Sequence, residues 1–217
     1  MKIKDVKDSS EKELIKNFQV RFNLQEDDFT INEKGYVIKI NSDNPEAHYE
    51  LGNQLFEKDL MDEAISEYKE VIKFYKKTAP VNIKDWHELA ISSWYNMGTA
   101  YSLMSDFPKA IECYNEVLNI SPDDIKTLYN LGGIYSQNRQ FDKAIIYLLK
   151  VLELDPNNPE YDLAWFTLGY YYANNEQFNK AIKYLKKALE FDPNNLMIKK
   201  LVLEIQKKLI DHPNGRD

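Results

Sequence analysis

Histidine is the residue type best suited to hold a metal or move a proton at neutral pH, and this chain of 217 residues has three: His48, His87 and His212. A metal site on a helix needs a second ligand three or four positions away, where both share a face. The acidic residues that follow the first two histidines, Glu50 and Glu88, lie only two and one positions away. The spacing therefore predicts no metal site.

Other residues with reactive side chains are few. The single cysteine, Cys113, directly precedes Tyr114 in a predicted helix, and we interpret it as a small packing residue. Two carboxylate pairs, Asp27–Asp28 and Asp123–Asp124, lie in predicted turns, where aspartate is typical of a helix start. The sequence has no glycine-rich phosphate loop, Gly-x-Ser-x-Gly elbow or Cys-x-x-Cys pair. We therefore expect a protein that is not an enzyme, with no catalytic residues and no cofactor.

Composition sets limits on class and location. Hydrophobic residues make up 43% of the chain and charged residues 29%, as in an ordinary folded protein. No apolar run reaches the roughly 18 residues of a membrane span, and the N-terminus lacks the apolar core of a signal peptide. One cysteine cannot form an intramolecular disulfide, so a cytoplasmic location is expected.

The net charge of −7 is unevenly distributed, because residues 45–124 carry 15 acidic and 7 basic side chains, a balance of −8. Nucleic-acid binding normally needs a basic face, so nucleic acid is not an expected partner. The acidic segment has two interpretations that stay open: a surface for a basic partner, or a solvated outer face.

One pattern recurs four times. A glycine in a helix-forming segment is followed twelve residues later by an alanine in a second such segment. Counted from each glycine, positions −4, −1 and +3 are mostly bulky and apolar and share one helix face. Glycine costs about 1 kcal/mol relative to alanine inside a helix, so its recurrence indicates close approach of a second helix. The pairs are Gly52 and Ala64, Gly98 and Ala110, Gly132 and Ala144, and Gly169 and Ala181.

Over residues 45–195 this pattern resembles the tetratricopeptide repeat family. The resemblance implies an all-α fold, an α-α superhelix of four helix–turn–helix repeats with a capping helix that covers the last apolar face. Prolines at Pro122, Pro156 and Pro193 predict where second helices end. In the first repeat His48 replaces a bulky apolar residue and Lys76 replaces the proline. The family's turn glycine is replaced in every repeat, by Asp59, Ser105, Arg139 and Glu176. The predicted repeats are 45–78, 91–124, 125–158 and 162–195.

The glycine spacing varies between repeats. It is 34 residues from the second repeat to the third and 37 from the third to the fourth, with added residues near Asn157–Tyr161, where Pro159 would open a lengthened helix. From the first repeat to the second it is 46 residues. We interpret this excess as elongation of both flanking helices around a break near Ala79–Asn82. It either leaves a binding notch between the two repeats or is simply tolerated.

Two ends flank the repeats. Residues 1–44 predict a short amphipathic helix and then a β-hairpin around the turn NEKG. This extension either docks as an arm in a groove, of its own array or of another copy, or lies over the first repeat. Residues 196–211 predict the capping helix and 212–217 a tail. Apolar residues alternate on both sides of the hairpin turn, at Phe29 and Ile31 and then at Tyr36, Ile38 and Ile40. In the capping helix one apolar stripe, predicted to cover the last repeat, contains Met197, Leu201, Ile205 and Leu209.

In the tetratricopeptide repeat family the first helix of each repeat lines a concave groove that binds an extended peptide or a helix of another protein. The resemblance therefore implies that positions −3, −2 and +1 face a partner. Aromatic residues at −3 would add apolar area, and asparagines can both donate to and accept from a peptide backbone. The predicted partner-binding residues are Tyr49, Asn53, Tyr95, Asn96, Thr99, Lys126, Tyr129, Asn130, Phe166 and Tyr170.

One subclass of the family grips the C-terminal carboxylate of heat-shock chaperones with two asparagines and three basic residues. Asn53, Asn96 and Lys126 agree with that clamp, but Tyr49 and Asn130 stand where a lysine and an arginine are needed. Because charge-assisted hydrogen bonds of about 1.5–3 kcal/mol each would be lost, the clamp is not expected. The predicted function is a protein–protein interaction adaptor or scaffold. The alternatives are a self-assembling structural protein and a regulatory subunit of an enzyme complex.

Overall fold

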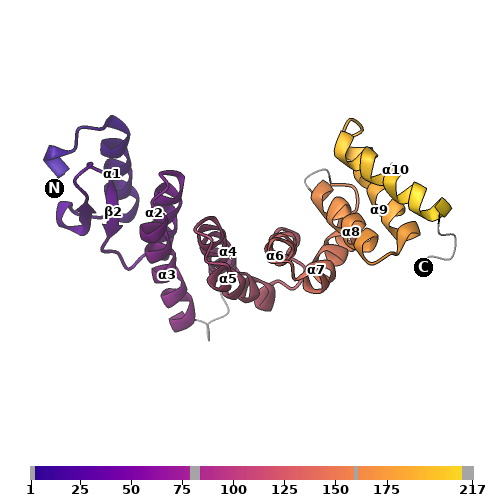
Figure 1. Cartoon of the computed structure of the whole chain (residues 1–217). Coiled ribbons are helices and arrows are strands. Elements are labelled where there is room, and N and C mark those ends of the chain that lie inside the picture. The colour runs from indigo at the N-terminus through magenta and orange to yellow at the C-terminus, as the bar shows by residue number, and fades with distance from the viewer. Residues whose placement is uncertain (1–2, 79–83, 159–160, 212–217) are drawn as a thin grey trace. The chain divides into compact units, whose positions relative to one another are not determined.

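The computed structural model describes residues 3–78, 84–158 and 161–211. The chain divides into two compact units, Met1–Pro122 and Asp123–Asp217, and most of its helices form consecutive pairs joined by short turns (Figure 1). The predicted all-α fold of helix–turn–helix pairs is confirmed. The pairs are α2 (Pro45–Glu57) with α3 (Met61–Thr78) and α4 (Lys84–Leu103) with α5 (Phe107–Ile120) in the first unit, and α6 (Ile125–Gln137) with α7 (Phe141–Leu154) and α8 (Asp162–Asn174) with α9 (Phe178–Phe191) in the second.

The helical glycines lie where the second helix of each pair directs a large side chain at the first. A Cβ added to Gly98 would lie 2.7 Å from Cε1 of Tyr114, closer than carbon atoms pack. The predicted close approach is therefore confirmed, but the residue at +16 makes it, while the alanine at +12 is fully buried beside it. The same contact joins Gly52 to Tyr68, Gly132 to Leu148 and Gly169 to Leu185.

The turns inside the pairs use the left-handed backbone region without glycine. In the second pair, Ser105 has a φ of 63°, and the next N–H, of Asp106, donates to the Tyr101 carbonyl at 2.8 Å. This bond satisfies a carbonyl at the end of the first helix, as in a Schellman motif. Left-handed residues other than glycine cost about 1–2 kcal/mol, so each turn stores some strain. The other three are Asp59, Arg139 and Glu176, with φ values of 61°, 56° and 59°.

The N-terminal extension forms the predicted helix, α1 (Ser9–Phe22), and the predicted hairpin, β1 (Phe29–Ile31) and β2 (Val37–Ile40), with short 3-10 turns at Ile3–Asp5 and Glu26–Asp28. The strands are antiparallel, with a register shift between Thr30 and Ile31. The shift turns Val37 inward with Ile40, and both are 1% exposed. Burial in the second strand therefore does not follow the apolar alternation, since Tyr36 and Ile38 are only half-buried.

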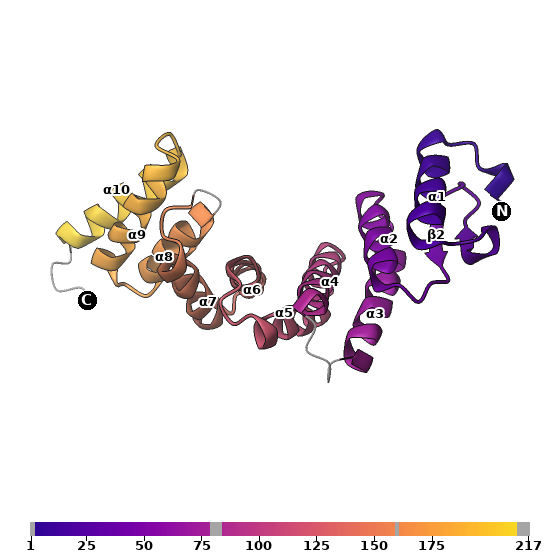
Figure 2. The same cartoon turned by 180° about the vertical axis from the view of Figure 1, so that it is seen from behind.

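This extension lies over the first repeat and does not dock as an arm in the groove. The strand β2 contacts α2 and α3, and α1 and β2 lie beside α2 in Figure 1 and Figure 2. The buried carboxylate of Glu11 on α1 accepts hydrogen bonds from the Val37 N–H at 2.8 Å and from Lys58 Nζ at 2.6 Å. Because a buried charge needs partners, this residue fixes helix, hairpin and repeat together.

The insertion between the first two repeats lengthens the helices on either side of it. The helix α3 has 18 residues and α4 has 20, whereas the other paired helices have 13 or 14. The predicted elongation is confirmed. The predicted break near Ala79–Asn82 lies outside the described residues, and so does Pro159.

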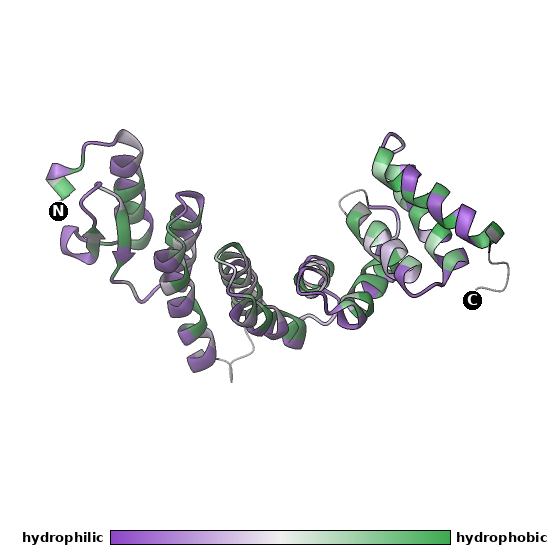
Figure 3. Ribbon diagram, viewed as in Figure 1, coloured by the Kyte–Doolittle hydropathy of each residue, from purple (hydrophilic) through white to green (hydrophobic). Residues whose placement is uncertain are grey.

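The helix α10 (Leu196–Asp211) packs on α9 through Ile198, Val202 and Ile205, which are 3–7% exposed. Met197 is 61% exposed, so its predicted inward position is wrong: the buried row starts one residue later. The α10 ribbon carries both hydrophobic green and hydrophilic purple segments (Figure 3), as an amphipathic cap requires. The predicted tail, 212–217, lies outside the described residues. Along the part of the chain that is described, none of the helices has both the length and the apolar character of a bilayer-crossing segment.

Candidate functional site: the groove face and a hollow behind it

The predicted groove residues of the first unit lie on α2 and α4 and are joined by side-chain hydrogen bonds. Asn96 on α4 donates from Nδ2 to Oδ1 of Asn53 on α2 at 3.0 Å. Tyr68 on α3 donates its hydroxyl to the same oxygen at 2.8 Å, and Asn96 Nδ2 lies 3.3 Å from that hydroxyl. Burial raises the pKa of Tyr68, so the hydroxyl stays protonated and remains a donor. Amides from two adjacent repeats are therefore held in one orientation.

These bonds leave one donor and one acceptor unused. Within the described residues, Asn53 Nδ2 and Asn96 Oδ1 have no hydrogen-bond partner, and both side chains are only half-buried. A backbone peptide group offers one carbonyl and one N–H, so this pair of amides suits an extended chain laid across α2 and α4.

The remaining predicted residues of the first unit contribute shape more than polar contacts. The Thr99 hydroxyl lies 3.0 Å from the Tyr95 carbonyl, to which it donates, and 3.1 Å from the Tyr114 hydroxyl. Its only proton is thus used internally. The half-buried rings of Tyr49 and Tyr95 pack against Tyr68 and Tyr114, with centroids 6.0 Å and 5.8 Å apart.

In the second unit the predicted residues present an aromatic surface. Phe166 and Tyr170 on α8 stack with centroids 6.2 Å apart, and Tyr170 is 42% exposed. Tyr129 on α6 packs at 5.0 Å against the ring of a tyrosine just before α8. Lys126 is exposed and Asn130 is half-buried. We call the ten predicted residues the groove face, with an amide part in the first unit and an aromatic part in the second.

Two residues with reactive side chains, Cys113 and His48, are buried in the structure. Cys113 is 3% exposed, and burial raises the pKa of its thiol to about 12, so it is no thiolate nucleophile at neutral pH. His48 is also buried, with Nδ1 2.6 Å from Oε2 of Glu67 and Nε2 donating to the Ser42 carbonyl at 2.9 Å. Burial lowers the pKa of His48, but the Glu67 and Ser42 hydrogen bonds outweigh it and raise the pKa above 6.5. His48 therefore links the extension to α2 and α3. Among the described residues no cluster of three metal-ligating side chains occurs.

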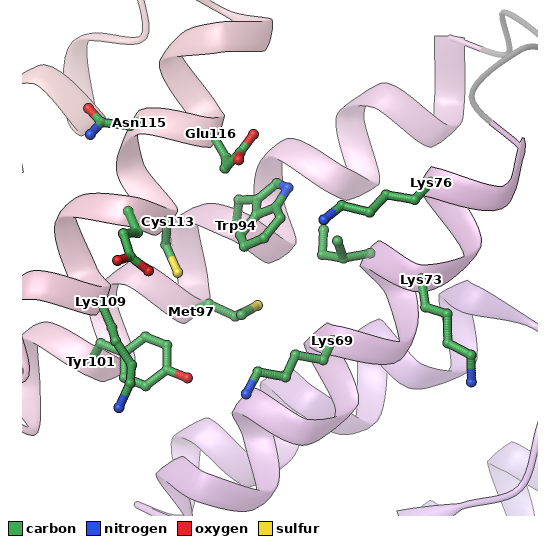
Figure 4. Close-up of a pocket in the computed structure, with 12 residues that line it drawn as sticks. Lys69, Lys73, Lys76, Trp94, Met97, Tyr101, Lys109, Cys113, Asn115 and Glu116 are labelled. Carbon is green, nitrogen blue, oxygen red and sulfur yellow. The ribbon is translucent and has the colours of Figure 1, made fainter.

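A hollow of about 870 Å³ lies between α3, α4 and α5. Its α4 wall is the stripe Trp94, Met97 and Tyr101, at positions −4, −1 and +3. At about 100° per residue, this stripe lies on the opposite side of α4 from the groove positions. Figure 4 shows Lys69 and Lys76 reaching toward the stripe from α3. The glycine spacing predicts a notch between these repeats as one of two alternatives, but it does not indicate which residues would line it.

Comparison with known proteins agrees with the geometry. A family model described as a tetratricopeptide repeat matches residues 91–124, and a second one with the same description matches residues 123–194. In the first unit, the family model matches the second helix pair, α4 with α5. In the second unit, both helix pairs are matched.

Solved structures share the fold at low sequence identity. The structure of MamA from Desulfovibrio magneticus RS-1 is 20% identical over 79% of this chain and 89% of its own, with a TM-score of 0.60. A structure of MamA AMB-1 is 22% identical over 78% and 84%, with a TM-score of 0.60. The Pseudomonas aeruginosa PilF structure is 16% identical over 77% and 69%, with a TM-score of 0.55. With repeated helix pairs, the glycine contacts and the two sequence matches in agreement, this chain is a tetratricopeptide repeat protein.

Proposed function

We propose that this protein is a non-catalytic interaction scaffold whose groove face holds an extended peptide or a helix of another protein. The observation that carries the proposal is the Asn53–Asn96 pair, which is fixed by Tyr68 and retains an unused donor and an unused acceptor. Fixed polar groups favour binding because little side-chain entropy is lost when the partner arrives.

The aromatic part of the groove face complements this polar grip. Tyr170 exposes 42% of its surface, and its ring rests against Phe166, so it offers a rigid apolar contact. Aromatic side chains supply much of the energy of protein interfaces. The amide part suits a partner with accessible backbone groups, and the aromatic part, in the other unit, suits one with apolar side chains.

Affinity capture from native lysate tests the proposal. The wild-type chain is compared with a variant carrying Tyr95→Ala, Asn96→Ala, Tyr129→Ala and Asn130→Ala. A matched control carries Glu153→Ala and Lys183→Ala, at exposed positions of second helices. We expect a partner that the wild type and the control retain and that the folded groove variant loses. Equal retention by all three proteins would overturn the proposal.

Self-association is the second candidate, and the cap helix favours it. Leu196, Leu203 and Ile210 follow each other at seven-residue intervals along α10 and are 79%, 65% and 79% exposed. Such a row on one side of a helix is typical of a surface that meets another helix. If copies associate there, sedimentation velocity at rising concentration should show an oligomer that Leu203→Glu abolishes. A monomer at every concentration would exclude it.

A further inference from the structure

The third and fourth repeats share a ring contact on the side of the chain away from the groove face. In each, the tyrosine at position +3 of the first helix stacks on a tyrosine at position +15 of the second. Tyr135 and Tyr147 have centroids 5.5 Å apart and ring planes 9° apart. Tyr172 and Tyr184 have centroids 5.3 Å apart and planes 13° apart.

The second repeat lacks this contact. Its residue at +3 is Tyr101, but its residue at +15 is Cys113, and no ring stacks on Tyr101 among the described residues. The lysine at +11 is retained, since Lys109 Nζ lies 5.2 Å from the Tyr101 ring centre, like its counterparts in the two later repeats. The difference is therefore confined to the position of the missing ring, and Tyr101 and Cys113 both line the 870 Å³ hollow.

We propose that this hollow binds an aromatic side chain from an acidic segment of a partner protein. The incoming ring stacks on Tyr101, as the tyrosine at +15 does in the later repeats, with Trp94 and Met97 forming the rest of the wall (Figure 4). Offset-stacked rings with centroids 4.5–7 Å apart attract each other, so Tyr101 offers a surface of the right kind.

The charges around the hollow argue for the acidic flank. Residues 45–124 have a net charge of −8, yet four of their seven basic residues line this hollow. Lys73 and Lys109 are paired with nearby carboxylates, whereas no described carboxylate lies within 4 Å of Lys69 or Lys76. Lys76 Nζ instead lies 5.5 Å from the Trp94 ring centre. A carboxylate beside the entering ring gives these two ammonium groups an ion-pair partner, which none of the described carboxylates provides.

The orientation of the partner follows from the opposite wall. Glu112 and Glu116 of α5 also line the hollow, so the partner's carboxylates must face α3 rather than α5. This site lies behind α4 from the groove face and goes beyond the proposed function. Either site can therefore fail while the other holds.

Fluorescence anisotropy with a labelled Ser-Glu-Asp-Tyr-Asp-Glu-Ser peptide tests the inference. Two further peptides replace the tyrosine with alanine or the four acidic residues with lysine. Cys113→Tyr restores the ring found in the later repeats and should fill the hollow. Lys76→Glu reverses a charge at its edge. The matched controls are Ile146→Tyr, on an exposed position of α7, and Lys77→Glu, the neighbouring lysine outside the lining.

We expect the tyrosine peptide to bind the wild type and both controls alike, and to bind Cys113→Tyr and Lys76→Glu at least about tenfold more weakly. Both altered peptides should show the same loss with the wild type. Methyl NMR of the wild type gives a second readout, because the Met97 signal should shift on peptide addition whether or not Cys113→Tyr folds. Undiminished binding to Cys113→Tyr, equal binding of the alanine peptide, an unshifted Met97 methyl or no binding at about 1 mM protein would each overturn the inference.

Discussion

Two neighbouring glycines of α6 should respond in opposite ways to the same substitution. A Cβ added to Gly132 would lie 2.5 Å from Cδ2 and 2.7 Å from Cγ of Leu148 on α7. A Cβ added to Gly133 meets nothing within 4 Å. The residues share one helix and one backbone conformation, so each is the other's control.

The magnitudes follow from two effects. Alanine is favoured over glycine inside a helix by about 1 kcal/mol, and this gain applies to both positions. Gly133→Ala meets no opposing contact, so the free energy of unfolding should rise by about 1 kcal/mol. Gly132→Ala forces a buried leucine out of its packing, and overpacking costs about 1–3 kcal/mol. After the helix gain is subtracted, the net loss is about 0–2 kcal/mol, and the two variants should differ by the overpacking cost, about 1–3 kcal/mol.

Urea unfolding followed by far-UV circular dichroism measures this difference. Gly133→Ala should unfold at a higher urea concentration than the wild type and Gly132→Ala at a lower one. If both variants gained stability equally, the contact between position +16 and the helical glycine would be refuted. That result would also remove the packing reason for Gly132 and for its counterparts Gly52, Gly98 and Gly169 in the other repeats.

Two further predictions concern the turns and the histidine. Ser105→Gly should raise the free energy of unfolding by about 1 kcal/mol, because glycine relieves the strain of the left-handed backbone. The control Ser66→Gly, at an exposed position inside α3, should lower the free energy of unfolding by about 0.5 kcal/mol. Urea unfolding distinguishes the two signs, and equal losses of stability would contradict the turn geometry. The pKa of His48 is raised above its usual 6.5 in the folded state. The stability it contributes is therefore fully present below pH 6.5 and is lost as pH rises through the folded-state pKa. As the pH rises from 6.5, the urea midpoint of the wild type should fall, and that of His48→Phe should fall less steeply. Identical pH dependence of the two midpoints would contradict the pairing of His48 with Glu67.

Much of the fold follows from local sequence patterns. The glycine and alanine spacing, with prolines after the second helices, identified the helix pairs because these residues have few alternatives in helix packing. The extra residues before Trp94 predicted longer helices correctly, since they contain helix-favouring residues on both sides of one break. The hairpin was predicted, but its register was not. The register shifts after Thr30, and Val37, opposite Ile31, donates its N–H to Glu11 of α1, a contact that strand alternation does not reveal.

The contacts of the candidate site could be predicted from the sequence less well than the fold. Family resemblance places Asn53 and Asn96 on the same face, but only the structure shows that Tyr68 fixes both. His48 looked like a core substitution, and its link to Ser42 depends on where the extension lies. The hollow did leave a signal in the sequence: Cys113 stands where the next two repeats have tyrosine. This difference indicates a missing ring contact only because the structure shows that the tyrosines at positions +3 and +15 stack on each other in the third and fourth repeats.

Photo-crosslinking tests the central proposal most directly. A benzophenone amino acid is placed at Tyr170, on the groove face and 42% exposed, or at Ile146, on α7 and 68% exposed. Both proteins are irradiated in native lysate. We expect a crosslinked partner protein from position 170 and none from position 146. A crosslink from position 146 alone would place the partner on the second helices and contradict the groove face as the binding surface.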